Sequence, residues 1–387
     1  SSIAADFFAR FKRIDGFKVH FLTGTDEHGL KIQRAAESKN IDPQIFCDEI
    51  SQTFRNLSNT LNLSNTDFIR TTEDRHKKTV QYLWSQLEKN DDIYLSKYSG
   101  WYSVSDEAFY TEEEISEKED NKIATSSGSL VEWIEEESYF FRLSKWQDSL
   151  LEYYENNPDF ISPKSRKNEV ISFVKSGLKD LSISRKAFSW GIKVPNNPEH
   201  VIYVWLDALT NYISALNYPN TDDDLFKNFW PASVHLIGKD ILRFHAVYWP
   251  AFLMAAKITL PNKVYGHGWI LSGDEKMSKS KGNILDPLDI IETYGLDPLR
   301  YYLIKEVSFG NDGNISQDRL EDCINSDLAN NYGNLCQRVT AFAEKNCQSK
   351  VPDIKNFIEE DLLMLNKFSN NMSLIRKEID NQNINYY

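Results

Sequence analysis

The sequence predicts an α/β protein in which an open parallel sheet is split by an insert and followed by an all-helical domain. Three strand-like segments, residues 18–23, 233–237 and 263–266, each run into a polar loop that contains glycine. Helix-forming sequence follows the first two loops, which is the strand–helix alternation of a parallel sheet. Beyond residue 315, apolar residues recur at helical spacing. Ligands of such sheets bind outside the carboxyl ends of the strands, so the glycine-containing loops are the candidate site.

The 387 residues are enough for two or three domains. We expect the sheet domain in two halves, residues 1–92 and 199–262, around an insert of residues 93–198 that is rich in aromatic and acidic residues. The sheet pattern is expected to resume within residues 201–208. A linker, residues 263–314, follows, and residues 315–387 form the helical domain, which we expect to be incomplete. The apolar stripe of that domain consists of Leu328, Tyr332, Leu335, Val339 and Phe342.

The composition narrows the class of protein. The four cysteines are scattered without a CxxC pair, which argues against a disulfide framework and against a zinc knuckle, and suits a reducing cytoplasm. The apolar run 244–256 contains His245 and Pro250 and predicts a buried helix, not a membrane span. A net charge of −13 lowers the expectation of nucleic-acid binding without removing it, because phosphate contacts depend on local basic patches.

The sharpest motif is the pentapeptide KMSKS at residues 276–280. Two lysines, Lys276 and Lys279, in a short serine-rich loop suit a cationic clamp for a polyphosphate. The pentapeptide resembles the signature loop of class I aminoacyl-tRNA synthetases. The resemblance extends to methionyl-tRNA synthetases through four further motifs in that family's order: TGTDEHG (23–29), SRKAFSWGIKVP (184–195), YVWLDAL (203–209) and HLIGKDILRFH (235–245).

This resemblance implies a Rossmann-type catalytic domain split by a connective insert, and an anticodon-binding helical bundle. It implies activation of methionine with ATP and transfer of methionine to tRNA. In that family the KMSKS loop stabilises the charge that develops on the leaving pyrophosphate. Lys279 resembles the main ATP ligand and Lys276 assists it; Asp240 resembles the ligand of the ribose hydroxyls. The ATP-binding residues implied are Gly238, Lys239, Asp240, Lys276, Lys279 and Ser280.

The methionine site implied by the resemblance has a polar and an apolar end. Asp26 looks like the carboxylate that receives the substrate ammonium group, since a short acid just past a strand end is held rigidly. Glu27 and His28 either contact the substrate or hold the loop together. Aromatic side chains suit a thioether, and Tyr212 and His245 are candidates for reading the sulfur or closing the pocket. The pocket residues implied are Trp205, Ala208, Tyr212, Phe244, His245 and Trp249.

The segment GNLCQR in the helical domain resembles the family's anticodon-reading helix, in which Asn334 and Arg338 hydrogen-bond exposed bases. The expected partners are tRNA(Met), including the initiator tRNA, and L-methionine, with no membrane. ATP is expected with Mg²⁺. The insert contains no cysteine, so it resembles the family's knuckle-free branch, and no structural zinc or protein metal ligand is expected. We expect a cytoplasmic monomer.

The family's HIGH segment is not among these residues, and we expect it to precede Ser1. Three alternatives stay open from the sequence. A sister synthetase for leucine, isoleucine, valine or cysteine shares the loop motifs. A tRNA-binding relic of a synthetase would tolerate a missing HIGH segment. A nucleotidylyltransferase would use the same scaffold without the anticodon helix.

Overall fold

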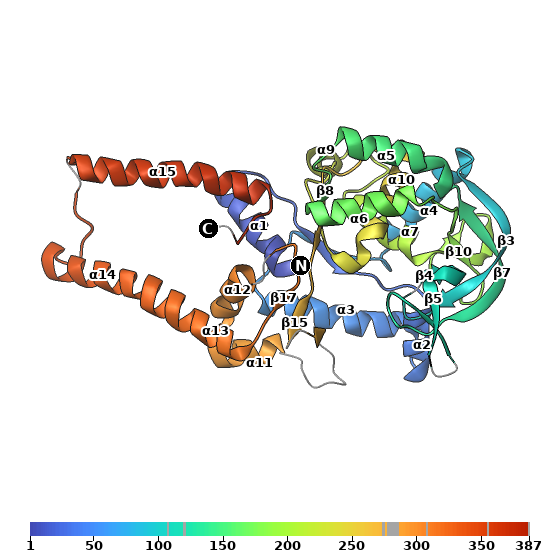
Figure 1. Ribbon diagram of the computed structural model, residues 1–387, viewed down its shortest axis with the longest axis horizontal. Helices are drawn as coiled ribbons and strands as arrows, with labels where there is room; N and C mark the ends of the chain where they lie inside the picture. Colours follow the sequence, from blue (N-terminus) through green and yellow to red (C-terminus); the bar gives the residue numbers. More distant parts are fainter. Residues whose placement is uncertain are drawn as a thin grey trace. The chain divides into compact units, whose positions relative to one another are not determined.

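The computed structural model describes residues 1–106, 108–118, 121–272, 275–276, 286–306, 309–353 and 356–385. Two compact units make up the chain, Ala4–Gly266 and His267–Tyr387; Ser2 groups with the first, and Ser1 and Ile3 with the second. Figure 1 shows the elements of both units.

The first unit contains, in chain order, α1 (Ser2–Ile14), β1 (Leu22–Thr25), α2 (Leu30–Ser38), α3 (Pro43–Thr60), β2 (Asp67–Arg70), α4 (Asp74–Lys89), β3 (Ile93–Ser103), β4 (Ala108–Tyr110), η1 (Glu112–Glu114), β5 (Ile115–Lys118), β6 (Asn121–Ala124), β7 (Glu132–Phe141), η2 (Leu143–Trp146), α5 (Gln147–Asn156), β8 (Ile161–Ser162), α6 (Lys164–Lys175), β9 (Leu181–Ser182), β10 (Ser184–Arg185), β11 (Lys193–Val194), β12 (Asn197–Ile202), α7 (Val204–Leu209), α8 (Asn211–Ser214), α9 (Asp224–Phe229), β13 (His235–Gly238), η3 (Lys239–Ile241), η4 (Phe244–Tyr248), α10 (Trp249–Ala255) and β14 (Val264–His267).

The parallel pair β1–β2 places the first candidate loop. Leu22 lies opposite Asp67, and the register continues to Thr25 opposite Arg70. A β-carbon on Gly24 would lie 1.9 Å from the carbonyl oxygen of Ile69, so only glycine allows the two strands to approach this closely. Because the strands are parallel, the loops that follow them leave from the same edge.

A second group of strands has the order β13-β14-β8 and places the second and third candidate loops. Val264 of β14 lies opposite Ile161 of β8, and the two strands are parallel. Strand β8 falls within residues 93–198, the range expected for the insert, yet it pairs with a strand that follows residue 262. The parallel α/β character predicted from the sequence is confirmed, although these strands form two small groups.

Strand β12 differs from the expected parallel pattern. It is the middle strand of an antiparallel sheet with the order β10-β12-β11, and Val201 lies opposite both Arg185 and Lys193. The strand ends at Ile202, and helix α7 begins at Val204. A short apolar run predicts burial but does not determine strand direction. The sequence pattern therefore could not show that β12 is antiparallel.

The insert is built around β3 and β7, which pair antiparallel from Ile93–Phe141 to Tyr102–Glu132 and curve together in Figure 1.

The carboxylate of Asp106 joins the segments at the tip of the insert. Asp106 accepts hydrogen bonds from Ser127 Oγ (2.5 Å), Tyr110 Oη (2.7 Å) and Ser129 Oγ (2.8 Å), and its backbone N–H donates to Ser103 Oγ (3.2 Å). Burial raises the pKa of Asp106, but the hydroxyl donors outweigh it and hold this pKa below its ordinary value.

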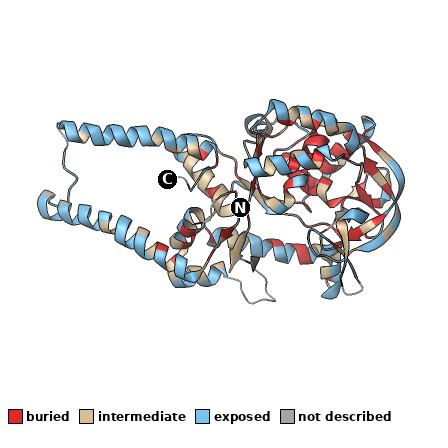
Figure 2. Cartoon of the chain, in the orientation of Figure 1, coloured by how far each residue is buried: buried red, intermediate tan, exposed pale blue. Residues whose placement is uncertain are grey.

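One large cluster of buried side chains dominates the core of the first unit (Figure 2), and a smaller one consists of Leu30, Phe188 and Val201. Helix α4 contributes Val80, Leu83, Trp84 and Leu87, which lie at i, i+3, i+4 and i+7 and so share one face. Helices α5, α6, α7 and α10 contribute to the same cluster. The large cluster includes Ile237 of β13 and Val264 of β14, so it holds the strands that carry the second and third candidate loops.

The second unit contains β15 (Ile270–Ser272), β16 (Glu275–Lys276), α11 (Pro287–Tyr294), α12 (Leu296–Lys305), β17 (Gly313–Asn314), α13 (Gln317–Cys323), η6 (Ile324–Gly333), α14 (Asn334–Cys347) and α15 (Glu359–Asp380). A small cluster around Tyr302, Ile315 and Leu320 forms its core. The helical prediction for its end is confirmed. The apolar stripe lies on η6 and α14, but Tyr332, Leu335, Val339 and Phe342 are each more than half exposed. Figure 2 shows α14 and α15 almost wholly pale blue.

Candidate active site

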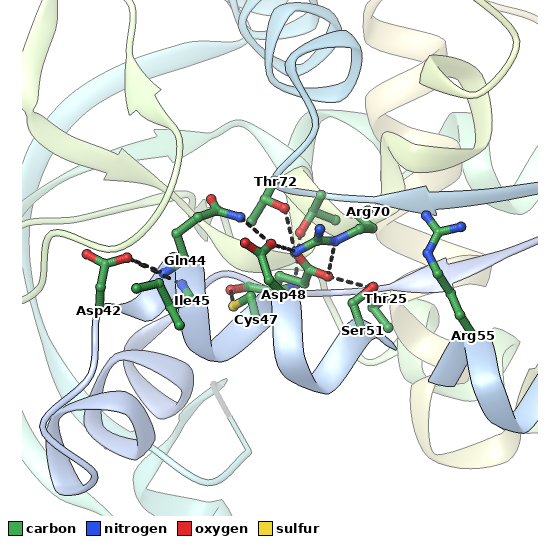
Figure 3. Close-up of polar contacts among 12 residues, drawn as sticks. Thr25, Asp42, Gln44, Ile45, Cys47, Asp48, Ser51, Arg55, Arg70 and Thr72 are labelled. Atoms are coloured by element: carbon green, nitrogen blue, oxygen red, sulfur yellow. Dashed lines mark hydrogen bonds and ion pairs between the residues drawn. The ribbon is translucent and has the colours of Figure 1, made fainter. Parts of the chain in front are cut away.

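Glu27 fixes the loop that follows β1. Its carboxylate accepts hydrogen bonds from Thr72 Oγ1 (2.5 Å), Thr25 Oγ1 (2.6 Å) and Arg70 Nε (2.8 Å), and only 3% of the residue is exposed. Figure 3 shows Arg70 and Thr72 converging here, with Asp48 also bonded to Arg70 at 2.6 Å. These side-chain hydrogen bonds raise the pKa of Arg70 further above its ordinary value, with Glu27 the largest cause. Glu27 therefore attaches the loop to β2.

His28 attaches the same loop to the helices behind it. Its Nδ1 donates to Asp207 Oδ2 (2.6 Å), and His76 Nε2 donates to the other carboxylate oxygen (2.7 Å). His76 Nδ1 contacts Ser214 Oγ at 2.8 Å. All four residues are at most 4% exposed. Burial raises the pKa of Asp207, but the two histidines outweigh it and hold this pKa below its ordinary value.

A tryptophan from the SRKAFSWGIKVP segment covers this loop. Trp190 Nε1 donates to the backbone oxygen of Glu27 (2.6 Å), and the Gly29 N–H donates to the backbone oxygen of Trp190 (3.2 Å). Its indole packs edge-on against the His28 ring, with centroids 5.5 Å apart. Asp26, between these fixed neighbours and Thr25, is exposed. The loop thus presents one exposed carboxylate on a rigid frame.

The predicted pocket residues are brought together by α7, α8, η4 and α10. The rings of Trp205 and Phe244 stack with centroids 3.7 Å apart at 8°. The Tyr212 ring lies 6.3 Å from that of Trp249, which is fully buried. Phe244 to Tyr248 form a π-helical turn, in which the hydrogen bonds run from i to i+5. The sequence predicted an ordinary helix here, because a π-turn has no simple residue signature.

His245 is neutral, and its tautomer follows from its partners. Its Nδ1 donates to the carbonyl oxygen of Ile241 (3.0 Å), so Nε2 accepts the hydrogen bond from the Tyr212 hydroxyl (2.7 Å). Burial lowers the pKa of His245 to about 4 and raises that of Tyr212. His235, whose ring centroid lies 3.9 Å from that of Tyr212, has its pKa lowered well below the ordinary value by burial. The arrangement is an uncharged aromatic site.

The predicted nucleotide loop follows β13. A β-carbon on Gly238 would lie 2.5 Å from Asp240 Oδ1, so a larger residue here would displace this carboxylate. Asp240 is exposed and Lys239 is partly exposed on the short helix η3. Lys276 lies in β16, which pairs with β15, whereas Lys279 and Ser280 lie outside the described residues.

The predicted anticodon residues lie one turn apart on α14. Asn334 Nδ2 donates to the backbone oxygen of Asn330 (2.8 Å), and Arg338 is exposed. Among the residues that the structure describes, no group of three His, Cys, Asp or Glu side chains could hold a metal ion. In the same part of the chain, no helix has both the length and the apolar character needed to cross a membrane.

Sequence reasoning missed Asp207, His76 and Trp190. Asp207 stands inside the YVWLDAL motif, and an acid between two pocket residues was a usable signal. His76 belongs to no motif, and its partner Asp207 lies 131 residues away, so no local pattern could have identified it.

Comparison with known proteins identifies the family to which the chain is similar. The family described as tRNA synthetases class I (M) matches residues 1–340. The methionine–tRNA ligase of Rickettsia bellii (strain RML369-C) is 59% identical over 354 residues, covering 92% of this chain and 69% of the relative. That of Brucella melitensis biotype 1 is 53% identical over 380 residues, covering 98% and 74%.

Solved structures of methionyl-tRNA synthetase also match this chain. The crystal structure of Mycobacterium tuberculosis methionyl-tRNA synthetase bound by methionyl-adenylate matches with a TM-score of 0.96 and 47% identity, covering 99% of this chain and 76% of that one. Its free state matches with a TM-score of 0.87 and 44% identity, covering 99% and 73%. The fold is therefore that of a class I tRNA synthetase. Within that class, the chain belongs to the methionine–tRNA ligases, and the sister synthetases are not supported.

Proposed function

We propose a role for each part of this site in the ligation of methionine to tRNA. In the first step the methionine carboxylate oxygen attacks the α-phosphorus of ATP; the bond to pyrophosphate breaks and methionyl-adenylate forms. In the second step a ribose hydroxyl at the 3′ end of tRNA attacks the carbonyl carbon, and AMP leaves. Residues 1–92 and 199–262 would carry the first step, with 93–198 as the connective insert, 263–314 as the linker and 315–387 as the anticodon domain.

The observation that carries the proposal is the uncharged aromatic site around Tyr212 and His245. Trp205, Ala208, Phe244 and Trp249 complete it. Sulfur–aromatic contacts contribute about 0.3–1.5 kcal/mol each, and a neutral imidazole next to a phenol offers a weakly polar contact for a thioether without a charge that would favour water. A site of this kind suits methionine better than a charged amino acid.

Asp26 would receive the substrate ammonium group. Its carboxylate is exposed, while its neighbour Glu27 is fully engaged within the protein, so Asp26 is the acid of this loop that a substrate can reach. Charge-assisted hydrogen bonds of this kind are roughly twice as strong as neutral ones.

The ATP ligands proposed from the motifs are Gly238, Lys239, Asp240, Lys276, Lys279 and Ser280. Asp240 would accept hydrogen bonds from the ribose hydroxyls, and Lys276 and Lys279 would stabilise the charge on the leaving pyrophosphate. ATP would enter as its Mg²⁺ complex, so the metal belongs to the substrate.

The tRNA would be read through Asn334 and Arg338 on α14, by hydrogen bonds to the edges of unpaired anticodon bases. Both the elongator and the initiator tRNA(Met) are proposed as substrates of a monomeric cytoplasmic enzyme.

Amino-acid-dependent ATP–pyrophosphate exchange tests the proposal. It is measured for residues 1–387 and for the chain extended at its amino end by a HIGH-containing segment. Exchange driven by methionine, but not by leucine, isoleucine, valine or cysteine, is expected in the extended chain. Exchange driven by another amino acid would overturn the proposed pocket, and no exchange in either form would overturn the proposed activation step.

A further inference from the structure

We propose that Asp207 is a positioning residue that sets the distance between the two ends of the methionine site. Asp207 lies on α7 between Trp205 and Ala208, two residues of the proposed pocket wall. Its carboxylate bonds to His28, two residues after Asp26. The inference rests on the roles proposed above for Asp26 and for the pocket.

Both oxygens of the Asp207 carboxylate are engaged, so its orientation is fixed. His28 occupies Oδ2 and His76 occupies Oδ1, at 2.6 and 2.7 Å, and the Asp207 side chain has no exposed surface. His76 comes from α4 and is itself held by Ser214 of α8. One carboxylate therefore joins the loop after β1 to three helices of the core.

The loop is held at two consecutive residues. Glu27 attaches it to β2 through Arg70 and Thr72, and His28 attaches it to α7 through Asp207. A buried donor or acceptor that loses its partner costs about 1–3 kcal/mol, so neither attachment opens readily. The backbone of Asp26, directly before this pair, has little freedom to move relative to α7.

The consequence is a fixed spacing between the carboxylate that would bind the ammonium group and the rings that would bind the thioether. A misplacement of about 1 Å can reduce a rate by about 10²-fold. A fixed spacing also discriminates by length, against a substrate such as homomethionine, which has one more methylene between the α-carbon and the sulfur. Loosening the Asp207–His28 contact should weaken both effects and leave the ATP side of the site unchanged.

The experiment uses ATP–pyrophosphate exchange in the HIGH-extended chain. We expect Asp207→Asn to raise the KM for methionine about tenfold while the KM for ATP stays within about twofold. The preference for methionine over homomethionine in kcat/KM should fall by about threefold or more. The matched control is Thr79→Val, which removes another buried hydrogen bond of α4, from Thr79 Oγ1 to the Tyr218 carbonyl oxygen (2.7 Å), outside this network.

A second pair of variants keeps the proposal testable if Asp207→Asn does not fold. His28→Asn retains an N–H donor near the position of Nδ1 and should keep the wild-type KM for methionine. His28→Phe removes the donor and should behave as Asp207→Asn. If His28→Phe and Asp207→Asn instead behave as Thr79→Val, the inference is overturned while the proposed function stands.

The variant Asp26→Ala tests the proposed role of Asp26 separately from the positioning role of Asp207. If it leaves the KM for methionine unchanged, the proposed role of Asp26 fails, and the inference fails with it. If it raises that KM, adding Asp207→Asn should cause little further increase, because Asp207 acts through Asp26. Full additivity would show that Asp207 acts by another route and would overturn the inference alone.

Discussion

At the scale of single residues, the burial of His245 makes the stability of the fold depend on pH. Its folded-state pKa of about 4 lies below the ordinary value of 6.5 because burial disfavours the imidazolium. Between those two values the unfolded chain binds a proton at this residue that the folded chain does not. Stability therefore falls as the pH drops through this window, and the loss is complete below about pH 4.

We expect His245→Gln to flatten this dependence. One proton taken up only by the unfolded chain corresponds to a slope of about 1.4 kcal/mol per pH unit. Urea midpoints measured at intervals from pH 7 to pH 4.5 would show a smaller decline in the variant than in the wild type. Parallel profiles would show that His245 is charged in the folded state or that its burial is not maintained.

A second prediction at this scale concerns the effect of Glu27 on stability. Glu27→Ala leaves Arg70 without its main buried partner, and removal of one member of a buried ion pair costs about 3–5 kcal/mol. Because Asp48 still contacts Arg70, we expect the lower end of that range in the free energy of urea unfolding. Glu37→Ala, at an exposed position on α2, should change the stability little. Equal effects of the two substitutions would contradict the structural role of Glu27.

Sequence motifs supplied the residues that we propose contact the substrate, but not those that hold them in place. Asp26, Trp205 and His245 stand within recognisable segments. The partners of the loop, His76 and Asp207, are residues of ordinary types brought together only by tertiary packing. Their roles depend on distances between elements, which no sequence spacing encodes.

At the scale of elements, the hydrogen bonds that Asp106 accepts hold the tip of the insert together. We expect Asp106→Ala to release segments 103–106 and 127–129 from each other, since three hydroxyl donors lose their acceptor. Hydrogen exchange at these backbone amides should accelerate by about tenfold or more, which is about 1.4 kcal/mol of local stability.

Helix α4, at the other end of β3, should keep its exchange protection in Asp106→Ala because its packing does not involve the tip. Glu117→Ala, at an exposed position on β5, serves as the control. Loss of protection throughout the first unit would mean that the tip supports the whole core.

The elements themselves were predicted unevenly. The helix α14 follows from the spacing of its apolar stripe. The direction of β12 and the π-turn at Phe244 do not, because each depends on partners that the local sequence does not specify.

At the scale of the whole molecule, activation and tRNA recognition can be tested separately, because the residues proposed for the two steps do not overlap. We expect Arg338→Gln to lower kcat/KM for tRNA charging by about tenfold or more, because an edge contact to a base is worth about 1–3 kcal/mol. Methionine-dependent exchange should be unchanged, since Arg338 lies on α14, outside the residues proposed to bind methionine or ATP.

Lys367→Gln on α15 removes the same charge from another exposed helix and should reduce charging far less. Equal losses in the two variants would mean that Arg338 contributes only general attraction to phosphates. The net charge of −13 makes this comparison informative, because the chain as a whole repels tRNA.

The overall architecture followed from three strand–loop segments and a change to helical periodicity, and the α/β class with a helical end is confirmed. The exposure of the apolar stripe on α14 could not be predicted from the sequence. Periodicity predicts which side chains share a helix face, but it does not say what covers that face.

The closure of the insert tip at Asp106 also bears on how the enzyme responds to its surroundings. Zinc knuckles join two loops through thiolates, which chelators can strip of metal and oxidants can convert to disulfides. At Asp106, a carboxylate surrounded by serine and tyrosine hydroxyls joins two segments through groups that neither reagent attacks. This part of the molecule should therefore keep its shape during metal starvation and oxidative stress.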